Sequence, residues 1–95
     1  MPSATRLGDF CSGHGCWHPR PSISASENVI INGLGAVRVS DWYLTHCCKG
    51  KCHPGQLAEG SSSVFINGLP AGRIGDAVNC GSVAAQGSPN VFIGG

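Results

Sequence analysis

Charge is scarce in this sequence of 95 residues, because Asp, Glu, Lys and Arg together make up only 12% and the formal net charge is +1. So small a charge gives no electrostatic footprint for nucleic acid or for an anionic membrane surface. Long apolar runs and the regular spacing of amphipathic helices are also missing. These absences argue against a membrane-spanning helix and a helical bundle.

The N-terminus, Met-Pro-Ser-Ala-Thr-Arg, lacks the apolar segment of a secretory signal peptide. We therefore expect synthesis in the cytoplasm, where thiols stay reduced. This favours metal binding over disulfide formation for the six cysteines, although a chain exported later by another route would oxidise. We expect a single domain over residues 1–95, with a core so modest that a metal, disulfides or oligomerisation must support it.

Glycine is abundant instead, with 15 residues, and 6 prolines accompany it. This composition is typical of short strands joined by tight turns, so the predicted fold class is all-β. Two segments of fourteen residues repeat each other, 28–41 (NVIINGLGAVRVSD) and 63–76 (SVFINGLPAGRIGD), and eight positions are identical. Each places Asn-Gly between two short apolar runs, which predicts β-hairpins with tips at residues 32–33 and 67–68.

The two ends of the chain supply a third copy. Residues 90–95 (NVFIGG) match the first half of the repeat, and residues 6–9 (RLGD) match the second half. We therefore predict that the termini pair with each other and close a pseudo-threefold body. In every copy an arginine precedes an aspartate by three residues: Arg6 and Asp9, Arg38 and Asp41, Arg73 and Asp76. We interpret the aspartates as turn caps with an adjacent ion pair, because a catalytic carboxylate would not normally be copied three times.

The first strand of each copy is apolar throughout, as Val-Ile-Ile, Val-Phe-Ile and Val-Phe-Ile. One face of these strands can fill the core. We expect the other face, with Ile30, Phe65 and Phe92, to form an exposed patch that binds a partner. The alternative is that both faces are buried within the domain.

Metal-binding residue types concentrate in residues 46–53 (HCCKGKCH). The repeat register selects among them, because His14 and His46 each follow a repeat aspartate by five residues, and Cys80 follows one by four. Equivalent turns can bring these three side chains together near the pseudo-axis. We choose His53 as the fourth ligand and expect the four on separate loops, but Cys52, Cys48 and Cys47 compete with it. Three imidazoles and one thiolate suit a tetrahedral zinc ion.

Each candidate ligand has a simpler interpretation. His14 and His46 could be solvated turn residues, and Cys80 could be a small buried apolar residue. His18 lies outside the repeat register, so we expect it to be exposed. The remaining cysteines are left open as reduced core residues, disulfides or a second metal site: Cys11, Cys16, Cys47, Cys48 and Cys52. Their CC-x3-C spacing differs from the usual CxxC knuckle.

The repeated hairpins, the GSxxVFING lead-ins and the terminal GSPNVFIGG resemble PAAR-repeat proteins over essentially the whole chain. The name-giving Pro-Ala-Ala-Arg occurs as Pro70-Ala71-Gly72-Arg73, which departs at its third position, and as the more degraded residues 35–38 (GAVR). The resemblance implies a small β-structured cone with a structural zinc ion near its vertex. The implied ligands are His14, His46, His53 and Cys80.

Members of that family cap the trimeric β-helical spike of contractile injection machines, which are type VI secretion systems and contractile phage tails. The resemblance therefore implies a non-enzymatic spike tip, made in the cytoplasm, that binds the blunt end of the spike and transiently contacts a target membrane. We expect any effector or cargo to be a separate protein and no nucleic acid to be bound. The sequence does not separate secretion system from phage tail.

Two other functions compete with this interpretation. A zinc-dependent hydrolase or toxin needs an open metal position and a general base, for which only Glu27 and Glu59 remain outside the repeated aspartates. A zinc-finger-like nucleic-acid binder would use Lys49 and Lys51 beside the aromatic residues 42–43, but two lysines are too few for multiple phosphate contacts.

Overall fold

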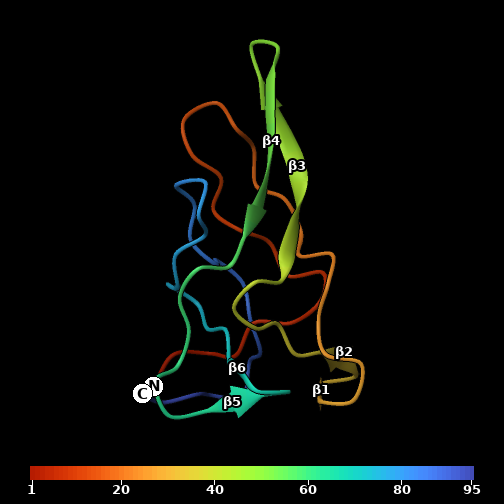
Figure 1. Cartoon of the computed structure of the whole chain (residues 1–95), viewed down its shortest axis with the longest axis vertical. Helices are drawn as coiled ribbons and strands as arrows, with labels where there is room; N and C mark the ends of the chain where they lie inside the picture. The colour runs from red at the N-terminus through yellow and green to blue at the C-terminus, as the bar shows by residue number, and fades with distance from the viewer.

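The computed structural model describes residues 1–95 and contains strands but no helix. The six strands form three antiparallel pairs: β1 (Ile30–Ile31) with β2 (Leu34–Gly35), β3 (Trp42–Cys48) with β4 (Lys51–Gln56), and β5 (Phe65–Ile66) with β6 (Leu69–Pro70). The body is narrow at the turn of β3 and β4 and broad where the other two hairpins and both termini lie (Figure 1). The predicted all-β, cone-shaped fold is confirmed. No helix long and apolar enough to cross a membrane is present.

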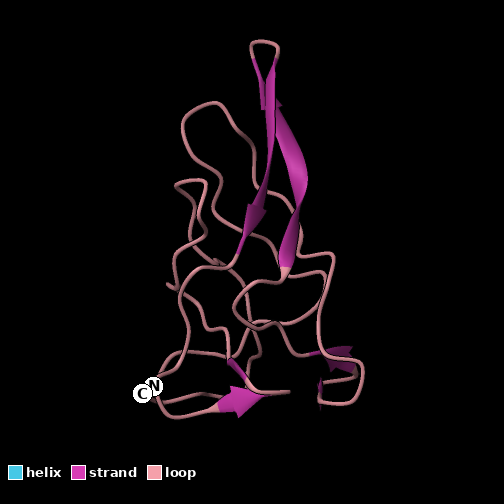
Figure 2. Ribbon diagram, in the orientation of Figure 1, coloured by secondary structure: helices cyan, strands magenta, loops and turns pink.

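Most of the chain outside the strands is irregular loop, as Figure 2 shows. Tight turns therefore determine much of the path of the chain. The tips of the two predicted hairpins have positive φ at both central residues, 54° and 80° at Asn32 and Gly33, and 54° and 79° at Asn67 and Gly68. A type I′ turn requires this conformation, and Asn and Gly adopt it at low cost. The hairpins predicted from the repeats are confirmed.

The termini form the third copy. Ser3 pairs with Phe92 in antiparallel fashion. On either side of this pair, the Ala4 N–H donates to the Val91 carbonyl at 3.0 Å and the Ile93 N–H donates to the Pro2 carbonyl at 2.9 Å. The predicted pairing of the two chain ends is confirmed, and it closes the pseudo-threefold body.

The three copies meet in a closed ring of backbone hydrogen bonds on the pseudo-axis. The Thr5 N–H donates to Gly72 O at 3.1 Å, the Gly72 N–H to Val37 O at 2.8 Å, and the Val37 N–H to Thr5 O at 3.1 Å. All three residues are buried. Removing one segment would therefore leave buried polar groups unpaired on both others, which is strongly unfavourable.

Side-chain hydrogen bonds join neighbouring copies nearer the base. In each, a buried lead-in serine donates to the tip of a different hairpin: Ser26 to Asn67 Oδ1 at 2.7 Å, Ser88 to Asn32 Oδ1 at 2.6 Å, and Ser61 to Gly94 O at 2.6 Å. Gly94 occupies the repeat position that holds asparagine in the other two copies. Its backbone carbonyl therefore replaces the missing amide oxygen.

The repeated strands face the core with one side only. Ile31, Ile66 and Ile93 are buried and pack in one cluster with Ala4, Ala36 and Ala71. Their neighbours point outward, with Ile30 55%, Phe65 57% and Phe92 50% exposed. The expected division of the strand faces is confirmed, and the alternative that both faces are buried is wrong. A second core cluster is formed by Cys11, Val37, Tyr43, Leu57, Val78 and Ala84.

Each repeat ends in a turn closed by its aspartate. In the first copy, Asp9 Oδ2 accepts the Arg6 backbone N–H at 2.8 Å and the Arg6 Nε–H at 2.9 Å. The same two bonds recur between Arg38 and Asp41 and between Arg73 and Asp76. The interpretation of the aspartates as turn caps with an ion pair is confirmed. The aspartate hydrogen bond is also the main reason that the pKa of each arginine is raised.

The third residue of this turn has positive φ in all copies, at Gly8 (89°), Ser40 (80°) and Gly75 (94°). Ser40 is the only one of the three with a Cβ, which is strained in this region. We therefore expect Ser40→Gly to stabilise the fold by about 0.5–1 kcal/mol, measured by urea denaturation. The matched reverse change, Gly75→Ser, should destabilise it by about 1 kcal/mol. Destabilisation by Ser40→Gly would contradict this account.

Candidate metal centre

Two candidate ligands, His46 and His53, lie directly opposite each other on β3 and β4. A two-residue turn of Lys49 (φ 51°) and Gly50 (φ 79°) joins the strands, and the register shifts between Tyr43 and His46. The expectation of four separate loops is therefore wrong for these two residues. The sequence signal is weak because lysine seldom takes the positive φ that this turn needs.

The other two candidates come from flanking loops. His14 lies in a tight loop where its N–H and carbonyl each bond to Trp17, both at 2.9 Å. Gly81 lies under the His14 ring, where an added Cβ would be 3.7 Å from Cγ, and it has a φ of 104°. Cys80 Sγ is 3.6 Å from Ser82 Oγ. These contacts fix the local positions of His14 and Cys80 within their loops.

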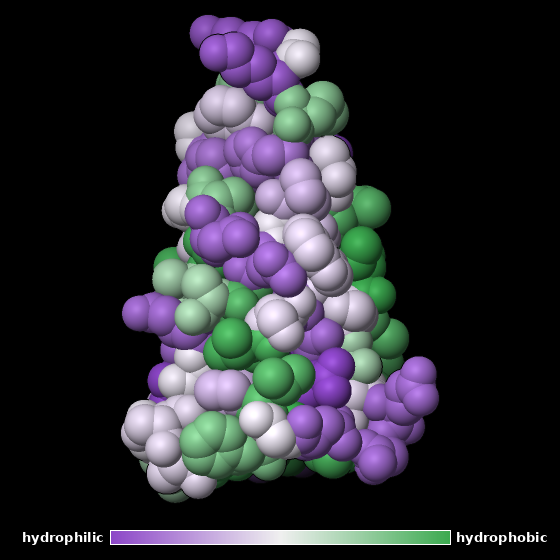
Figure 3. Space-filling model, viewed as in Figure 1, coloured by the Kyte–Doolittle hydropathy of each residue, from purple (hydrophilic) through white to green (hydrophobic).

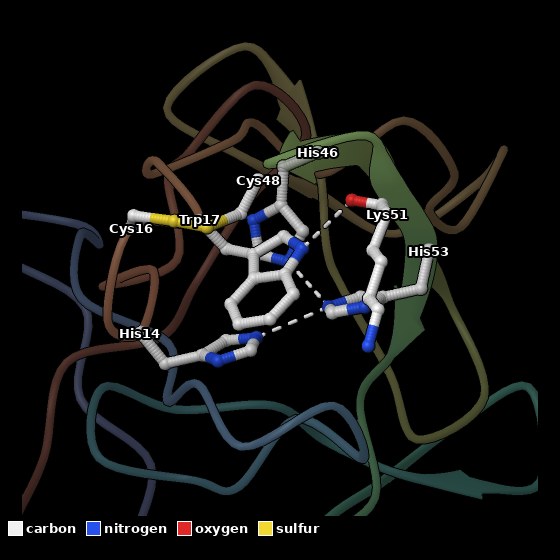
Figure 4. The surroundings of a disulfide bond; sticks show 7 residues. All are labelled: His14, Cys16, Trp17, His46, Cys48, Lys51 and His53. Atoms are coloured by element: carbon white, nitrogen blue, oxygen red, sulfur yellow. Dashed lines mark hydrogen bonds between the residues drawn. A yellow bond between two sulfur atoms is a disulfide. The ribbon is translucent and has the colours of Figure 1, made fainter.

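The structure brings all four predicted side chains together. The ligand atoms of His14, His46, His53 and Cys80 all lie within 4.8 Å of one another. His53 Nε2 is 2.7 Å from His46 Nε2 and 3.1 Å from His14 Nε2 (Figure 4). The edge of a tetrahedral zinc site with nitrogen ligands is about 3.3 Å. The group therefore has the size and donor types to hold a metal ion.

The hydrogen-bonding pattern of the three imidazoles also fits a group that can hold a cation. His46 Nδ1 lies 2.8 Å from the His18 carbonyl, which can only accept, so the proton is on Nδ1 and the Nε2 lone pair points into the group. A neutral His53 can donate one Nε2–H to that lone pair, which leaves its contact with His14 Nε2 unsatisfied. A metal ion among the three nitrogens would satisfy all of them.

The environment also keeps His53 neutral. Desolvation lowers the pKa of His53, and the proximity of the His46 and His14 imidazoles lowers it further. A neutral imidazole is the form that binds metal, so this shift favours metal binding at neutral pH.

Trp17 covers the group, a role that the sequence did not indicate. Its ring stacks on His14, with centroids 4.8 Å apart at 23°, and lies 5.2 Å from the His53 ring. The indole N–H donates to the Lys51 carbonyl at 3.2 Å. Trp17 lies outside the repeats, and its contacts with Lys51 and His53 depend on the β3–β4 hairpin, so no spacing in the sequence predicts them. The indole therefore packs over one side of the group.

Four cysteines form disulfides, Cys16 with Cys48 and Cys47 with Cys52. Disulfides are thus the alternative that holds for these four residues, and the general preference for metal binding over disulfide formation is wrong for them. Cys47 and Cys52 occupy paired positions of the hairpin, with Cα atoms 4.1 Å apart. The reducing conditions of the cytoplasm, on which that preference was based, say nothing about such proximity. Cys11 is free and buried, while Cys80 belongs to the metal group. His18 is exposed, as predicted.

The competing ligand Cys52 lies outside the group. It is paired with Cys47 and, by strand alternation, points to the opposite face of β4 from His53. Neither glutamate joins the group either, and Glu59 instead accepts the Ala77 N–H at 3.0 Å. The group thus offers three imidazoles and a thiol, without a carboxylate to act as a general base.

Comparison with known proteins gives one family match. A family model described as PAAR motif matches residues 12–86. This range includes His14, His46, His53 and Cys80. No curated protein matches the chain significantly.

The choice between His53 and Cys52 can be tested with Co²⁺ as a spectroscopic probe. We expect His53→Ala to weaken Co²⁺ binding at least about tenfold, because one ligand of the group is lost. The control, Cys47→Ser with Cys52→Ser, removes the outward-facing pair and should change the affinity less than about threefold. Titration of the visible d–d bands measures both. Equal losses in the two variants would contradict the assignment.

Proposed function

Because the chain belongs to the PAAR-motif family, we propose that it is the metal-stabilised tip of a trimeric β-helical spike in a contractile injection apparatus. It would cap the blunt end of the spike, sharpen it and help it to pierce a target membrane. This role is mechanical and needs no turnover, in keeping with a family of structural spike-tip domains. Type VI secretion systems and contractile phage tails both use such a part.

The broad end of the cone carries the observation that best supports this proposal. Ile30, Phe65 and Phe92 occupy equivalent positions of the three copies and are each half exposed or more. Apolar residues arranged with threefold pseudo-symmetry match the end of a threefold trimer, and such patches commonly mark binding surfaces. The narrow end is covered by hydrophilic residues instead (Figure 3).

Zinc is the metal that we propose for the group. Three imidazoles and one thiolate form a closed tetrahedral set that suits this ion. When bound, the metal would supply folding free energy by linking the His14 loop, the hairpin and the Cys80 turn. These segments lie near the narrow end, where few side chains are buried.

We expect protein purified without chelators to contain about one zinc ion per chain, measured by inductively coupled plasma mass spectrometry. Removing it with a chelator should lower the melting temperature by about 10 °C or more, because metal binding stabilises only the folded chain. Cys80→Ser should give a similarly lowered melting temperature that no longer responds to the chelator. Folded protein free of metal would contradict the zinc proposal.

We expect Phe65→Asp to weaken end-on binding to a trimeric β-helical spike protein at least about tenfold, because it places a charge in the centre of an apolar interface. Ile23→Asp provides a matched control, since Ile23 is 53% exposed, close to the 57% of Phe65, but lies outside the repeated strands. Biolayer interferometry with immobilised spike would compare them. Unchanged binding by Phe65→Asp would contradict the proposed interface.

A further inference from the structure

The loop of residues 13–19 supplies His14 and the covering Trp17, yet few bonds attach it to the hairpin. Apart from the contact of His14 Nε2 with His53 Nε2 inside the metal group, two hydrogen bonds join the loop to the hairpin. One runs from Trp17 Nε1 to the Lys51 carbonyl, and the other lies between the His18 carbonyl and His46 Nδ1. Its other backbone bonds join His14 and Trp17 to each other. The Cys16–Cys48 disulfide is the only covalent link across this contact, and it joins residues 32 apart in sequence.

The two disulfides differ in their relation to the metal group. Side chains alternate along β3, so Cys48 shares the face of His46, while Cys47 points to the other face. Figure 4 accordingly shows the Cys16–Cys48 bond beside His46 and Trp17. The Cys47–Cys52 bond links the two strands to each other and holds neither flanking loop. Only the first bond therefore restrains His14.

The two cysteines of this bond also differ in exposure. Cys16 is exposed, whereas Cys48 is buried, with 8% of its surface exposed. A thiolate reductant therefore reaches the Cys16 Sγ first. Attack there forms a mixed disulfide with Cys16, and Cys48 leaves as a thiolate that takes up a proton. The second thiol of a dithiol reductant then releases Cys16 as a thiol, so that two electrons reach the protein and the reductant becomes a disulfide.

We propose that the Cys16–Cys48 disulfide is a redox latch that controls how long the group of His14, His46, His53 and Cys80 retains its metal. The inference rests on the metal site of the proposed function. The closed bond keeps the His14 imidazole at a high effective concentration beside the other ligands, so a transiently released imidazole rebinds at once. Reduction by a dithiol frees the loop. His14 and Trp17 can then move away together, which exposes the metal to water and speeds its release.

With this disulfide, the rate at which the group releases its metal would differ between a reducing and an oxidising environment. Dithiol reductants keep thiols reduced in a cytoplasm, so the metal there would exchange readily. A disulfide oxidant outside the cell would close the bond by the reverse exchange and hold the metal in place. This would set retention by redox state while the broad end of the fold, which contains no cysteine cross-link, stays unchanged.

The test measures release of Zn²⁺ from the loaded, oxidised full chain to an excess of a chromogenic chelator. A phosphine reductant, which binds zinc weakly, opens the disulfides without competing for the metal. We expect reduction to accelerate release at least about tenfold. Cys16→Ser with Cys48→Ser should release zinc at the fast rate without reductant. Cys47→Ser with Cys52→Ser should release it slowly when oxidised and still respond to the reductant.

A Trp42→Phe background leaves Trp17 as the single indole, so its fluorescence reports whether the loop has moved. We expect the Trp17 fluorescence to change on reduction, together with the zinc release. The near-ultraviolet circular dichroism signal of the buried Tyr43 should stay at its native value, which would show that the core remains folded. Equal release rates with and without reductant would overturn the latch, and so would global unfolding on reduction. A chain that binds no zinc in either redox state would instead overturn the metal site itself, and the latch with it.

Discussion

The closed ring of backbone hydrogen bonds among Thr5, Val37 and Gly72 is the constraint on which the rest of the structure depends. It orients three chain segments around one axis, and each segment then enters an Arg-x-x-Asp turn held by the same two aspartate bonds. The residues that follow these turns emerge on the same side of the ring. Convergence of His14, His46 and Cys80 is therefore a geometric result of the ring, which also requires the two termini to pair.

Much of this arrangement could be predicted from the sequence because it is local and repeated. The Asn-Gly tips specify the hairpins, and the aspartates mark where each copy ends, so counting forward identifies three of the four grouped residues. Gly94 shows the limit of such counting. The other two copies have asparagine at the position of Gly94. Only the structure shows that the backbone carbonyl of Gly94 accepts the Ser61 hydrogen bond instead of an asparagine side chain.

Around the metal group, the parts that the sequence did not reveal involve the β3–β4 hairpin, which has no counterpart in the other copies. Its turn depends on Lys49 at a φ of 51°, an uncommon conformation for lysine, so the usual hairpin signal is absent. Without the hairpin, the pairing of Cys47 with Cys52 and the packing of Trp17 beside His53 have no visible basis. Selection of His53 over Cys52 relied partly on the family resemblance for the same reason, since strand alternation separates the two residues only once the strand is known.

The distribution of cross-links follows from the taper of the cone. At the broad end, three isoleucines and three alanines form a shared core, and serine and asparagine side chains join the copies. Towards the narrow end fewer side chains can be buried, so apolar packing contributes less. Both disulfides and the metal group lie in that part of the chain. Disulfides need no large buried surface, so they can stabilise a narrow end that has little hydrophobic core, and a metal ion held by the group would add to this.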